Sequence, residues 1–348
     1  MSGRGRDIGR TMRVALTYNL KKEVKESECL PADFYAECDE MDTVTAVRDA
    51  LLERHGEVLM VEADEDAFEK LRKQRPQMVF NMAEGVWGES REAQLPAIME
   101  MLRIPYTGSA PLTLGLCLNK ARAKEVLSHY DVPTARFMVV TDPAIDMERR
   151  LKLPMIVKPL FEGSSKGIRN DSLIFKSKDL KDKVSSVIKE YGQPALVEEY
   201  LEGREFTVAL LGNGDSLRTL PIVEINYSSL PEGVNPIYSY EAKWVFDTPE
   251  NPLDIFRCPA EVDPGLKKAI DRVAIDAFNA LDVKDWCRID IRLDGNGEPH
   301  VIELNPLPGI LVDPKCNSCF PKAARAAGMS FTGLVNAVID AARERYGI

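Results

Sequence analysis

Apolar and polar positions alternate between strand-like and helix-like spacing over the first third of the chain. Apolar runs bounded by turn residues predict three buried strands, at residues 12–18, 57–63 and 78–82. Apolar positions at helical spacing predict two helices between them, at residues 43–55 and 64–75. This order favours a parallel sheet with helices on its faces, so we expect a first α/β domain at residues 1–110.

The pattern changes after residue 110. Residues 111–130 predict one long helix. Three short strands then alternate with charged helices, at residues 136–140, 155–158 and 195–200. We expect these segments to form a smaller central domain, residues 111–204.

From residue 205 onward the apolar runs lie closer together, which favours an antiparallel sheet. Four strands are expected, at residues 206–211, 219–226, 288–293 and 300–305. Two helices, at residues 263–281 and 330–345, would cover the sheet of this third domain, residues 205–348. The polar segment at residues 228–259 is long enough to be a functional lid.

Composition and charge narrow the functional class. The 348 residues are 45% hydrophobic and 29% charged, which is typical of a folded protein too long for one core. The net charge of −10 would repel a nucleic-acid backbone, so no nucleic-acid partner is expected. Without an apolar run of membrane-spanning length or a signal-peptide pattern, we predict a cytoplasmic protein with no membrane association. The seven scattered cysteines favour reduced thiols, and the lone Cys316-x-x-Cys319 pair does not favour a metal site.

A glycine-rich segment follows the predicted strand that ends at Lys158. The P-loop and Rossmann glycine patterns are absent. The segment Glu162-Gly163-Ser164-Ser165-Lys166-Gly167 could instead direct backbone N–H groups and two hydroxyls toward phosphate oxygens, with Lys158 as a fixed positive charge. A plain hairpin turn beside an edge lysine explains the same residues equally well.

Two later strands predict a hairpin with one polar and one apolar face. A turn centred on Gly295 and Asn296 pairs Leu293 with Glu298 and Asp290 with Val301. Four polar side chains then share one face: Arg288, Asp290, Glu303 and Asn305. Five apolar side chains share the other: Ile289, Ile291, Leu293, Ile302 and Leu304. Two carboxylates and an amide oxygen suit Mg2+, which also binds nucleotide phosphates. A solvated polar face is the alternative, and a three-residue loop would flip one strand.

The predicted strand at residues 195–200 ends in acidic and aromatic groups. Glu198 and Tyr200 could contact a ribose or an adenine amine. An edge strand with solvated glutamates explains them equally well.

Eight blocks of residues, in one order, carry more information than any block alone. They are Phe80-Asn81 with residues 88–109, Asn119-Lys120 with Lys124, Val157-Lys158-Pro159, Glu162-Gly163-Ser164-Ser165-x-Gly167, Glu198-x-Tyr200-Leu201-x-Gly203-x-Glu205, Tyr240-Glu241-Ala242-Lys243, Arg288-Ile289-Asp290, and Glu303-x-Asn305-x-x-Pro308-Gly309. The series closely resembles the D-alanine–D-alanine ligases of the ATP-grasp family. The resemblance implies an α/β fold of three subdomains, with ATP between the central and C-terminal ones, and an ADP-forming ligase that activates a carboxylate as an acyl phosphate for an amine.

The same resemblance implies roles for individual residues. It places ATP phosphates at Lys120, Lys158 and Lys243, beneath a loop formed by Glu162, Gly163, Ser164, Ser165 and Gly167. It places adenosine at Glu198, Tyr200, Leu201 and Glu205. Two Mg2+ ions, or Mn2+ in their place, would bind Asp290, Glu303 and Asn305. Arg288 would stabilise the tetrahedral intermediate, with Ser164 and Lys243 completing the catalytic set. Gly309 would line the substrate site, and Ser318 would receive the second substrate's carboxylate.

Some positions depart from the family pattern. The glycine-rich first loop with its glutamate is missing from residues 18–26, although Glu23 or Glu26 could replace that acid. Glu84 stands where a histidine is common, and Trp244 replaces the lid tyrosine. Trp244 can donate a hydrogen bond but cannot accept one. We therefore predict an altered amino-acid site holding Glu84 and Trp244, and a poor D-alanine–D-alanine ligase. The expected substrate bears an amine and differs from D-alanine in size or stereochemistry, for example a larger amino acid or a peptide.

Two other functions are compatible with parts of this pattern. One is a nucleotide-binding regulatory module without turnover, from which some of Lys158, Arg288, Asp290, Glu303 and Asn305 would be expected to be missing; all are present. The other is an ester-forming ligase, because the attacking group belongs to the substrate. The expected partners are small molecules, and a homodimer is the commonest assembly for such a protein.

Overall fold

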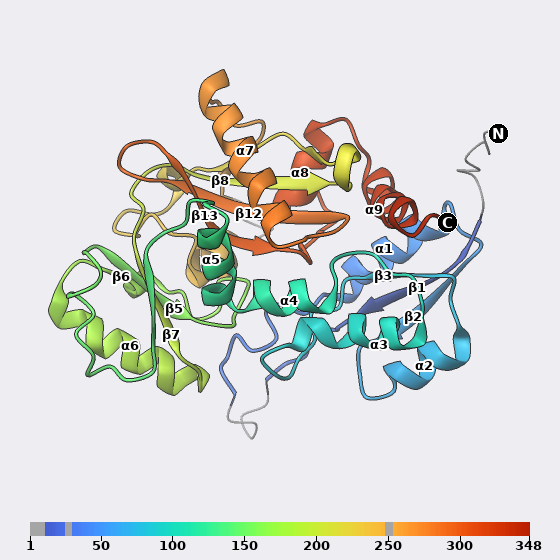
Figure 1. The fold of residues 1–348 in the computed structure, drawn as a ribbon, viewed down its shortest axis with the longest axis horizontal. Coiled ribbons are helices and arrows are strands. Elements are labelled where there is room, and N and C mark those ends of the chain that lie inside the picture. The colour runs from blue at the N-terminus through green and yellow to red at the C-terminus, as the bar shows by residue number, and fades with distance from the viewer. Residues whose placement is uncertain (1–10, 25–29, 248–252) are drawn as a thin grey trace.

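Three β-sheets organise the chain, which the computed structural model describes at residues 11–24, 30–247 and 253–348. Figure 1 shows the first sheet at the right of the molecule, the second at the lower left, and the third across the upper middle. The predicted boundaries near residues 110 and 204 fall between consecutive sheets, and they remain predictions. No helix in these ranges is long and apolar enough to cross a membrane.

The first sheet is parallel, as predicted from the strand–helix alternation. Its strands β1 (Arg13–Tyr18), β2 (Glu57–Glu62) and β3 (Met78–Asn81) lie in the order β2-β1-β3. Successive β1 side chains point to opposite faces. Val14 and Leu16 pack with α1 (Met41–Leu52), whereas Ala15 packs with α2 (Ala67–Gln74) and α3 (Gln94–Leu102).

The second sheet has four antiparallel strands in the order β4-β7-β5-β6. These are β4 (Phe137–Val140), β5 (Met155–Pro159), β6 (Leu173–Ile174) and β7 (Ala195–Glu199). Helix α6 (Ser177–Tyr191) covers one face through Leu180, Val184 and Val187. The other face carries Lys158 and Glu198, which are buried polar residues.

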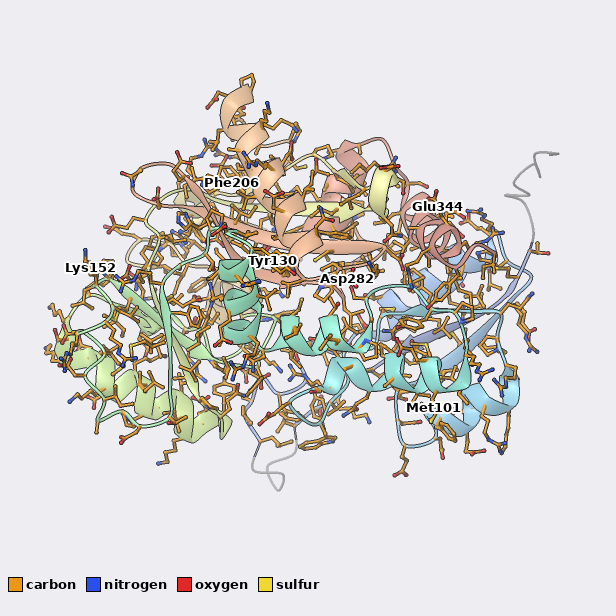
Figure 2. All side chains as sticks on the ribbon, viewed as in Figure 1. Met101, Tyr130, Lys152, Phe206, Asp282 and Glu344 are labelled. Carbon is orange, nitrogen blue, oxygen red and sulfur yellow. The ribbon has the colours of Figure 1, made fainter. Side chains whose placement is uncertain are left out.

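The third sheet is antiparallel and runs β11-β10-β8-β12-β13, with β9 paired to β8. Its strands are β8 (Glu205–Leu211), β9 (Arg218–Thr219), β10 (Val223–Ile225), β11 (Phe256–Arg257), β12 (Trp286–Leu293) and β13 (Pro299–Asn305). Helix α7 (Pro264–Ala280) packs on the face that holds Phe206, which is labelled in Figure 2. Helices α8 (Cys319–Ala326) and α9 (Phe331–Tyr346) join the core that also contains Trp286.

Two predicted elements were wrong because each is interrupted. The long helix at residues 111–130 is two helices, α4 (Pro111–Leu118) and α5 (Lys120–His129), separated at Asn119 with φ −82° and ψ 92°. The Asn119 side chain accepts a hydrogen bond from the Arg122 N–H and so starts α5 as its N-cap. The strand expected at residues 219–226 splits into β9 and β10, with Pro221 between them, because proline lacks the N–H for a ladder bond.

The predicted hairpin forms, but its register differs from the prediction. Leu293 pairs with Pro299 rather than Glu298, and Asp290 pairs with Glu303 rather than Val301. A bulge next to Asp290 leaves Ile302 without a partner in the ladder. Val301 therefore enters the core, whereas Ile302 lines a cavity instead of the apolar face. Beyond the bulge, Arg288 pairs with Asn305, so the four polar side chains share a face as predicted.

Candidate active site

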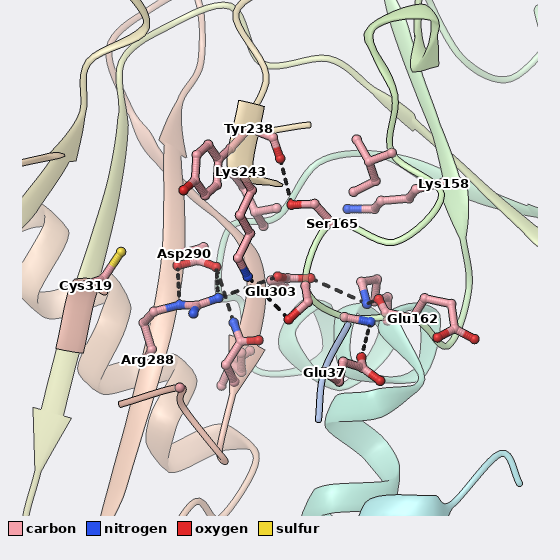
Figure 3. A pocket seen from close by; sticks show the side chains of 18 of the residues that line it. Glu37, Lys158, Glu162, Ser165, Tyr238, Lys243, Arg288, Asp290, Glu303 and Cys319 are labelled. Atoms are coloured by element: carbon pink, nitrogen blue, oxygen red, sulfur yellow. Dashed lines mark hydrogen bonds and ion pairs between the residues drawn. The ribbon is translucent and has the colours of Figure 1, made fainter. Parts of the chain in front are cut away.

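A cavity of about 450 Å³ lies between the second and third sheets. Strands β5 and β7 line one wall, and the polar face of β12 and β13 lines the other. The glycine-rich loop, the lid residues Lys243 and Trp244 and the segment after β1 enclose one end. The residues predicted to contact ATP, the metal ions and the substrates all line this cavity except Gly167, the last residue of the glycine-rich loop. Figure 3 shows several of these side chains pointing inward from different elements.

Two buried lysines hold one glutamate on the floor of the cavity. Glu198 lies 2.8 Å from Lys124 Nζ and 2.7 Å from Lys158 Nζ, and all three side chains are almost completely buried. Burial alone would raise the pKa of Glu198, but the two ammonium groups outweigh it and lower the pKa. Two positive charges and one negative charge leave a net positive charge, which suits a phosphate group. Both Glu198 oxygens already contact lysines, and its predicted contact with adenosine remains a prediction.

Lys120 connects the glycine-rich loop to the hairpin. Its Nζ donates a hydrogen bond to the backbone carbonyl of Glu162 and lies 3.5 Å from Glu303 Oε2. Its position at the start of α5 follows from the helix interruption at Asn119. Three lysines from three elements therefore reach the same cavity: Lys120, Lys158 and Lys243.

The glycine-rich loop contacts the segment at residues 228–259 that was predicted to be a lid. Ser164 and Ser165 adopt left-handed backbone conformations, with φ 48° and 60°. The Ser165 hydroxyl donates to the Tyr238 carbonyl at 2.7 Å, and Lys243 Nζ donates to Ser164 Oγ at 3.3 Å. The Trp244 indole N–H points to the Ser164 carbonyl at 3.4 Å, so it contacts the loop through the backbone. Burial and then the charge of Arg288 lower the Lys243 pKa to about 8.

The hairpin presents oxygen atoms beside an arginine. Arg288 donates to both oxygens of Asp290, at 3.0 and 2.9 Å, and the Asn305 amide nitrogen donates to the same carboxylate at 3.2 Å (Figure 3). Burial would raise the pKa of Glu303, but Lys120, Lys158 and Arg288 together lower it to about 2. An ionised glutamate opposite an aspartate, next to an amide whose oxygen remains available, is a donor set that fits Mg2+.

The far end of the cavity is polar and aromatic. Glu205 Oε2 accepts hydrogen bonds from Tyr227 and Arg292, both at 2.7 Å. The Arg292 guanidinium lies 4.4 Å from the centre of the Tyr200 ring and donates to the Tyr200 hydroxyl. This cluster, with Leu201, lies where the sequence predicted adenosine. Arg292 was not predicted as a site residue, although it continues the β12 series Arg288 and Asp290 at strand spacing.

Ser318 and Gly309 lie together at the start of α8. The Ser318 hydroxyl donates to the Gly309 carbonyl at 3.1 Å and accepts from the Leu311 N–H at 3.3 Å. Ser318 is the N-cap of α8, where backbone N–H groups favour a negative charge. The arrangement suits a substrate carboxylate.

The acid that reaches the glycine-rich loop is Glu37, which was not predicted. Glu37 Oε1 accepts from the Gly163 N–H at 2.6 Å, and Oε2 accepts from Lys166 and Arg91, both at 2.8 Å. Burial would raise the pKa of Glu37, but Lys166 and Arg91 lower it to about 2. Glu23 has no such contact, and Glu26 lies outside the described residues. Glu37, and not Glu23, therefore makes this contact with the glycine-rich loop.

The fold and cavity define an ATP-grasp protein. A family model described as the D-Ala–D-Ala ligase C-terminus matches residues 126–340. The chain is 36% identical over 318 residues to the uncharacterised protein y4sG of Sinorhizobium fredii, which covers 88% of each chain. It is 34% identical over 264 residues to the D-alanine–D-alanine ligase of Bordetella avium, covering 75% of this chain and 76% of the relative.

A solved structure supports the same fold. The D-alanine–D-alanine ligase of Bacillus anthracis complexed with ATP aligns with a TM-score of 0.72 at 21% identity, covering 96% of this chain and 98% of that one. The predicted α/β ATP-grasp fold is confirmed. The chain belongs to the D-alanine–D-alanine ligase family.

Proposed function

We propose that the protein is an ATP-dependent ligase that joins the carboxylate of one amino acid to the amine of a second amino acid or a peptide, releasing ADP and phosphate. One observation carries this proposal: cationic groups suited to phosphates, oxygen ligands suited to a metal, and Ser318 at the start of helix α8, suited to a carboxylate, all line one cavity. A regulatory module without turnover is less well supported. Such a module forms no tetrahedral intermediate, so it would not need Arg288 to stabilise one.

The proposed reaction has two steps. The γ-phosphoryl group of ATP passes to the first carboxylate, forming an acyl phosphate and ADP. The amine then attacks the acyl carbon, phosphate leaves, and the amine loses a proton. Lys120, Lys158 and Lys243 would neutralise phosphate oxygens, while Glu205, Tyr200 and Leu201 would hold the adenosine. Mg2+ at Asp290, Glu303 and Asn305 would neutralise further phosphate charge.

Other residues of the chain would position the acyl group. Arg288 would release part of its contact with Asp290 and stabilise the oxyanion of the tetrahedral intermediate. The loop from Glu162 to Gly167 would exclude water, since Ser164 and Ser165 already contact the lid. Ser318 and Gly309 would receive the carboxylate of the amine substrate, with Glu84 and Trp244 beside the first substrate.

A screen of ADP release tests this function. Purified protein, ATP and Mg2+ are combined with a panel of L- and D-amino acids, dipeptides and hydroxy acids, and the products are weighed by mass spectrometry to separate amides from esters. Lys158→Met should abolish ADP release, whereas Lys181→Met, at an exposed position on α6, should retain it. Binding of ATP without ADP release under every condition would favour the regulatory module and contradict the proposal.

A further inference from the structure

The end of the cavity next to Trp244 is lined by carboxylates from three separate segments. We define the acidic end by Glu37, Asp39, Glu84 and Glu92, all of which line the cavity. Glu37 and Asp39 come from the segment after β1, Glu84 follows β3, and Glu92 lies in the short helix Arg91–Ala93. Segments distant in the sequence therefore bring four acids to one place.

Charge pairing separates one of these acids from the other three. Glu37 pairs with Arg91 and Lys166, and the same two cations also reach Glu162 of the glycine-rich loop. Two cations thus neutralise two carboxylates. Asp39, Glu84 and Glu92 make no ion pair or side-chain hydrogen bond anywhere in the described part of the chain. Lys21, another lysine of the cavity wall, is paired with Glu40 at 3.0 Å.

Glu92 supplies an independent sign that a ligand belongs here. Only 9% of the residue is exposed, yet its carboxylate has no polar partner within the described ranges and lines the cavity. Buried carboxylates that serve the fold are usually paired, because an unpaired buried charge is costly. A carboxylate that is buried and unpaired beside a cavity can instead pair with a positively charged group of the bound ligand.

The ionisation of these groups agrees with a site that binds a cation. Burial raises the pKa of Asp39 and that of Glu92 to about 7 each, and it raises the pKa of Glu84 well above its ordinary value. For Glu92, Arg91, Lys120 and Lys166 oppose this increase, while Glu37 adds to it. A bound cation would restore the charged form of each acid.

The arrangement favours an organic cation over a metal ion. No group of three acidic, histidine or cysteine side chains within the described residues is close enough to hold one metal ion. Carboxylates spread along a cavity wall suit a ligand whose positive groups are separated by several bonds. The α-ammonium group of an amino acid would pair with one carboxylate. The remaining carboxylates could then pair with a second positive group on the same ligand.

We propose that the acidic end binds the side chain of a basic amino acid, so that the carboxylate-donating substrate carries a second ammonium or guanidinium group, held by Glu84, Glu92 and Asp39. This inference rests on the proposed ligase function and specifies its first substrate. Trp244, which already lies beneath Lys243 and Lys21 at 4.9 and 5.3 Å, would form an aromatic wall next to the same group.

Matched substrates and a trapping nucleophile test the inference. Hydroxylamine replaces the amine substrate and converts an acyl phosphate into a hydroxamate, so the first substrate is examined alone. Lysine is compared with norleucine, and ornithine with norvaline, in both enantiomeric series, with arginine and alanine added. We expect kcat/KM for hydroxamate formation to be at least about tenfold higher for each basic amino acid than for its neutral counterpart, roughly 1.4 kcal/mol.

Variants link that preference to the acidic end. Glu92→Gln and Glu84→Gln should each reduce the basic-to-neutral ratio by at least about fivefold, while Glu65→Gln, an exposed acid in the loop before α2, should keep it. ATP-induced stabilisation of each variant confirms that it is folded. Equal or higher kcat/KM for the neutral amino acids, or an unchanged ratio in both variants, overturns the inference and leaves the ligase function intact. Failure of every amino acid to form hydroxamate or release ADP overturns the function as well.

Discussion

The two ends of the cavity differ in how their charged groups are satisfied. At the end that we propose binds the ATP phosphates, called the phosphate end, Lys124 and Lys158 hold Glu198, and Lys120 lies beside Glu303. At the acidic end, Glu84, Glu92 and Asp39 lack such partners among the described side chains. The paired end is preorganised before its ligand arrives, whereas the unpaired end depends on its ligand for neutralisation. The residues that select the substrate are therefore expected at the acidic end, where carboxylates lack ion-pair partners within the described part of the protein.

The largest effect on activity is expected at Asp290, Glu303 and Asn305, the residues proposed to bind Mg2+. Glu303→Gln removes one negative charge at nearly constant shape, so it should lower kcat for ADP formation by at least about 100-fold, roughly 2.7 kcal/mol of barrier. Glu298→Gln on the same hairpin, at an exposed position, should change kcat little. Steady-state ADP release measures both, and a Glu303→Gln enzyme within about tenfold of the parent would remove Glu303 from the proposed ligand set.

Removing the carboxylate at the centre of the paired cluster should destabilise the fold. Glu198→Gln would leave Lys124 and Lys158 buried without their anion, so we expect a loss of about 3–5 kcal/mol in the free energy of unfolding at pH 7. Glu202→Gln, three residues beyond β7 and exposed, is the control. Urea unfolding followed by circular dichroism gives both values, and equal stability of the two variants would argue against a paired, preorganised end.

The corresponding glutamate-to-glutamine change at the acidic end, Glu92→Gln, should stabilise the fold, whereas Glu198→Gln should destabilise it. The pKa of Glu92 is raised from 4.5 to about 7 in the folded protein, so the folded state binds this proton more tightly than the unfolded chain does. Stability is therefore lost as the pH rises from about 4.5 to 7, and the loss is complete above that range. Glu92→Gln should raise the free energy of unfolding at pH 8 by up to about 3 kcal/mol, and by much less at pH 4.5.

Urea unfolding at the two pH values measures this difference. Glu65→Gln again serves as the exposed control, for which no pH-dependent gain is expected. A Glu92→Gln protein that is less stable than the parent at pH 8 would mean that Glu92 is neutralised in the folded protein, and the contrast between the two ends would disappear.

A smaller effect is expected at the loop that joins the two ends. Gly167 has φ 70°, and a Cβ atom there would lie 2.4 Å from Pro159 Cγ. Gly192 has a similar φ of 62°, but a Cβ atom there would meet no atom within 4 Å. Both glycine-to-alanine changes add backbone strain, whereas only Gly167→Ala adds a steric clash.

The difference between these alanine variants isolates the close packing of the loop. We expect Gly167→Ala to cost about 1–3 kcal/mol more stability than Gly192→Ala, and to weaken ATP binding because the loop can no longer close. Thermal unfolding with and without ATP measures both effects. Equal melting temperatures for the two variants in both conditions would show that the loop does not need this close approach.

The sequence predicted those features that depend on local periodicity. Apolar runs predicted the parallel sheet, and the shared polar face of Arg288, Asp290, Glu303 and Asn305 was correct although the register was wrong. Two errors in the predicted hairpin cancel. The loop is one residue longer than predicted, which shifts the pairing by one residue, and the bulge at Ile302 shifts it by one more. A total shift of two residues returns each side chain to its predicted face.

Features that depend on contacts between distant segments could not be predicted from local sequence patterns. Glu37 reaches Gly163 across 126 positions, and no local spacing signals that contact. Glu92 lacks an ion-pair partner among the described residues because Arg91 and Lys166 pair with Glu37 instead. Only the folded structure shows how these cations are distributed among the acids. The role of Lys124 had a local signal, since it follows Lys120 by one helical turn on α5, but that signal does not identify Glu198 as its partner.

The central claim is that an intact ATP-dependent ligase site operates beside an altered amino-acid site. The most direct test compares kcat/KM for ADP release with D-alanine alone and with each member of a panel of L-amino acids, D-amino acids and dipeptides, with every product weighed by mass spectrometry. We predict that ADP is released, that an amide is formed, and that D-alanine has a lower kcat/KM than at least one amino acid with a basic side chain. A kcat/KM for D-alanine equal to or above that of every other panel member would contradict the account.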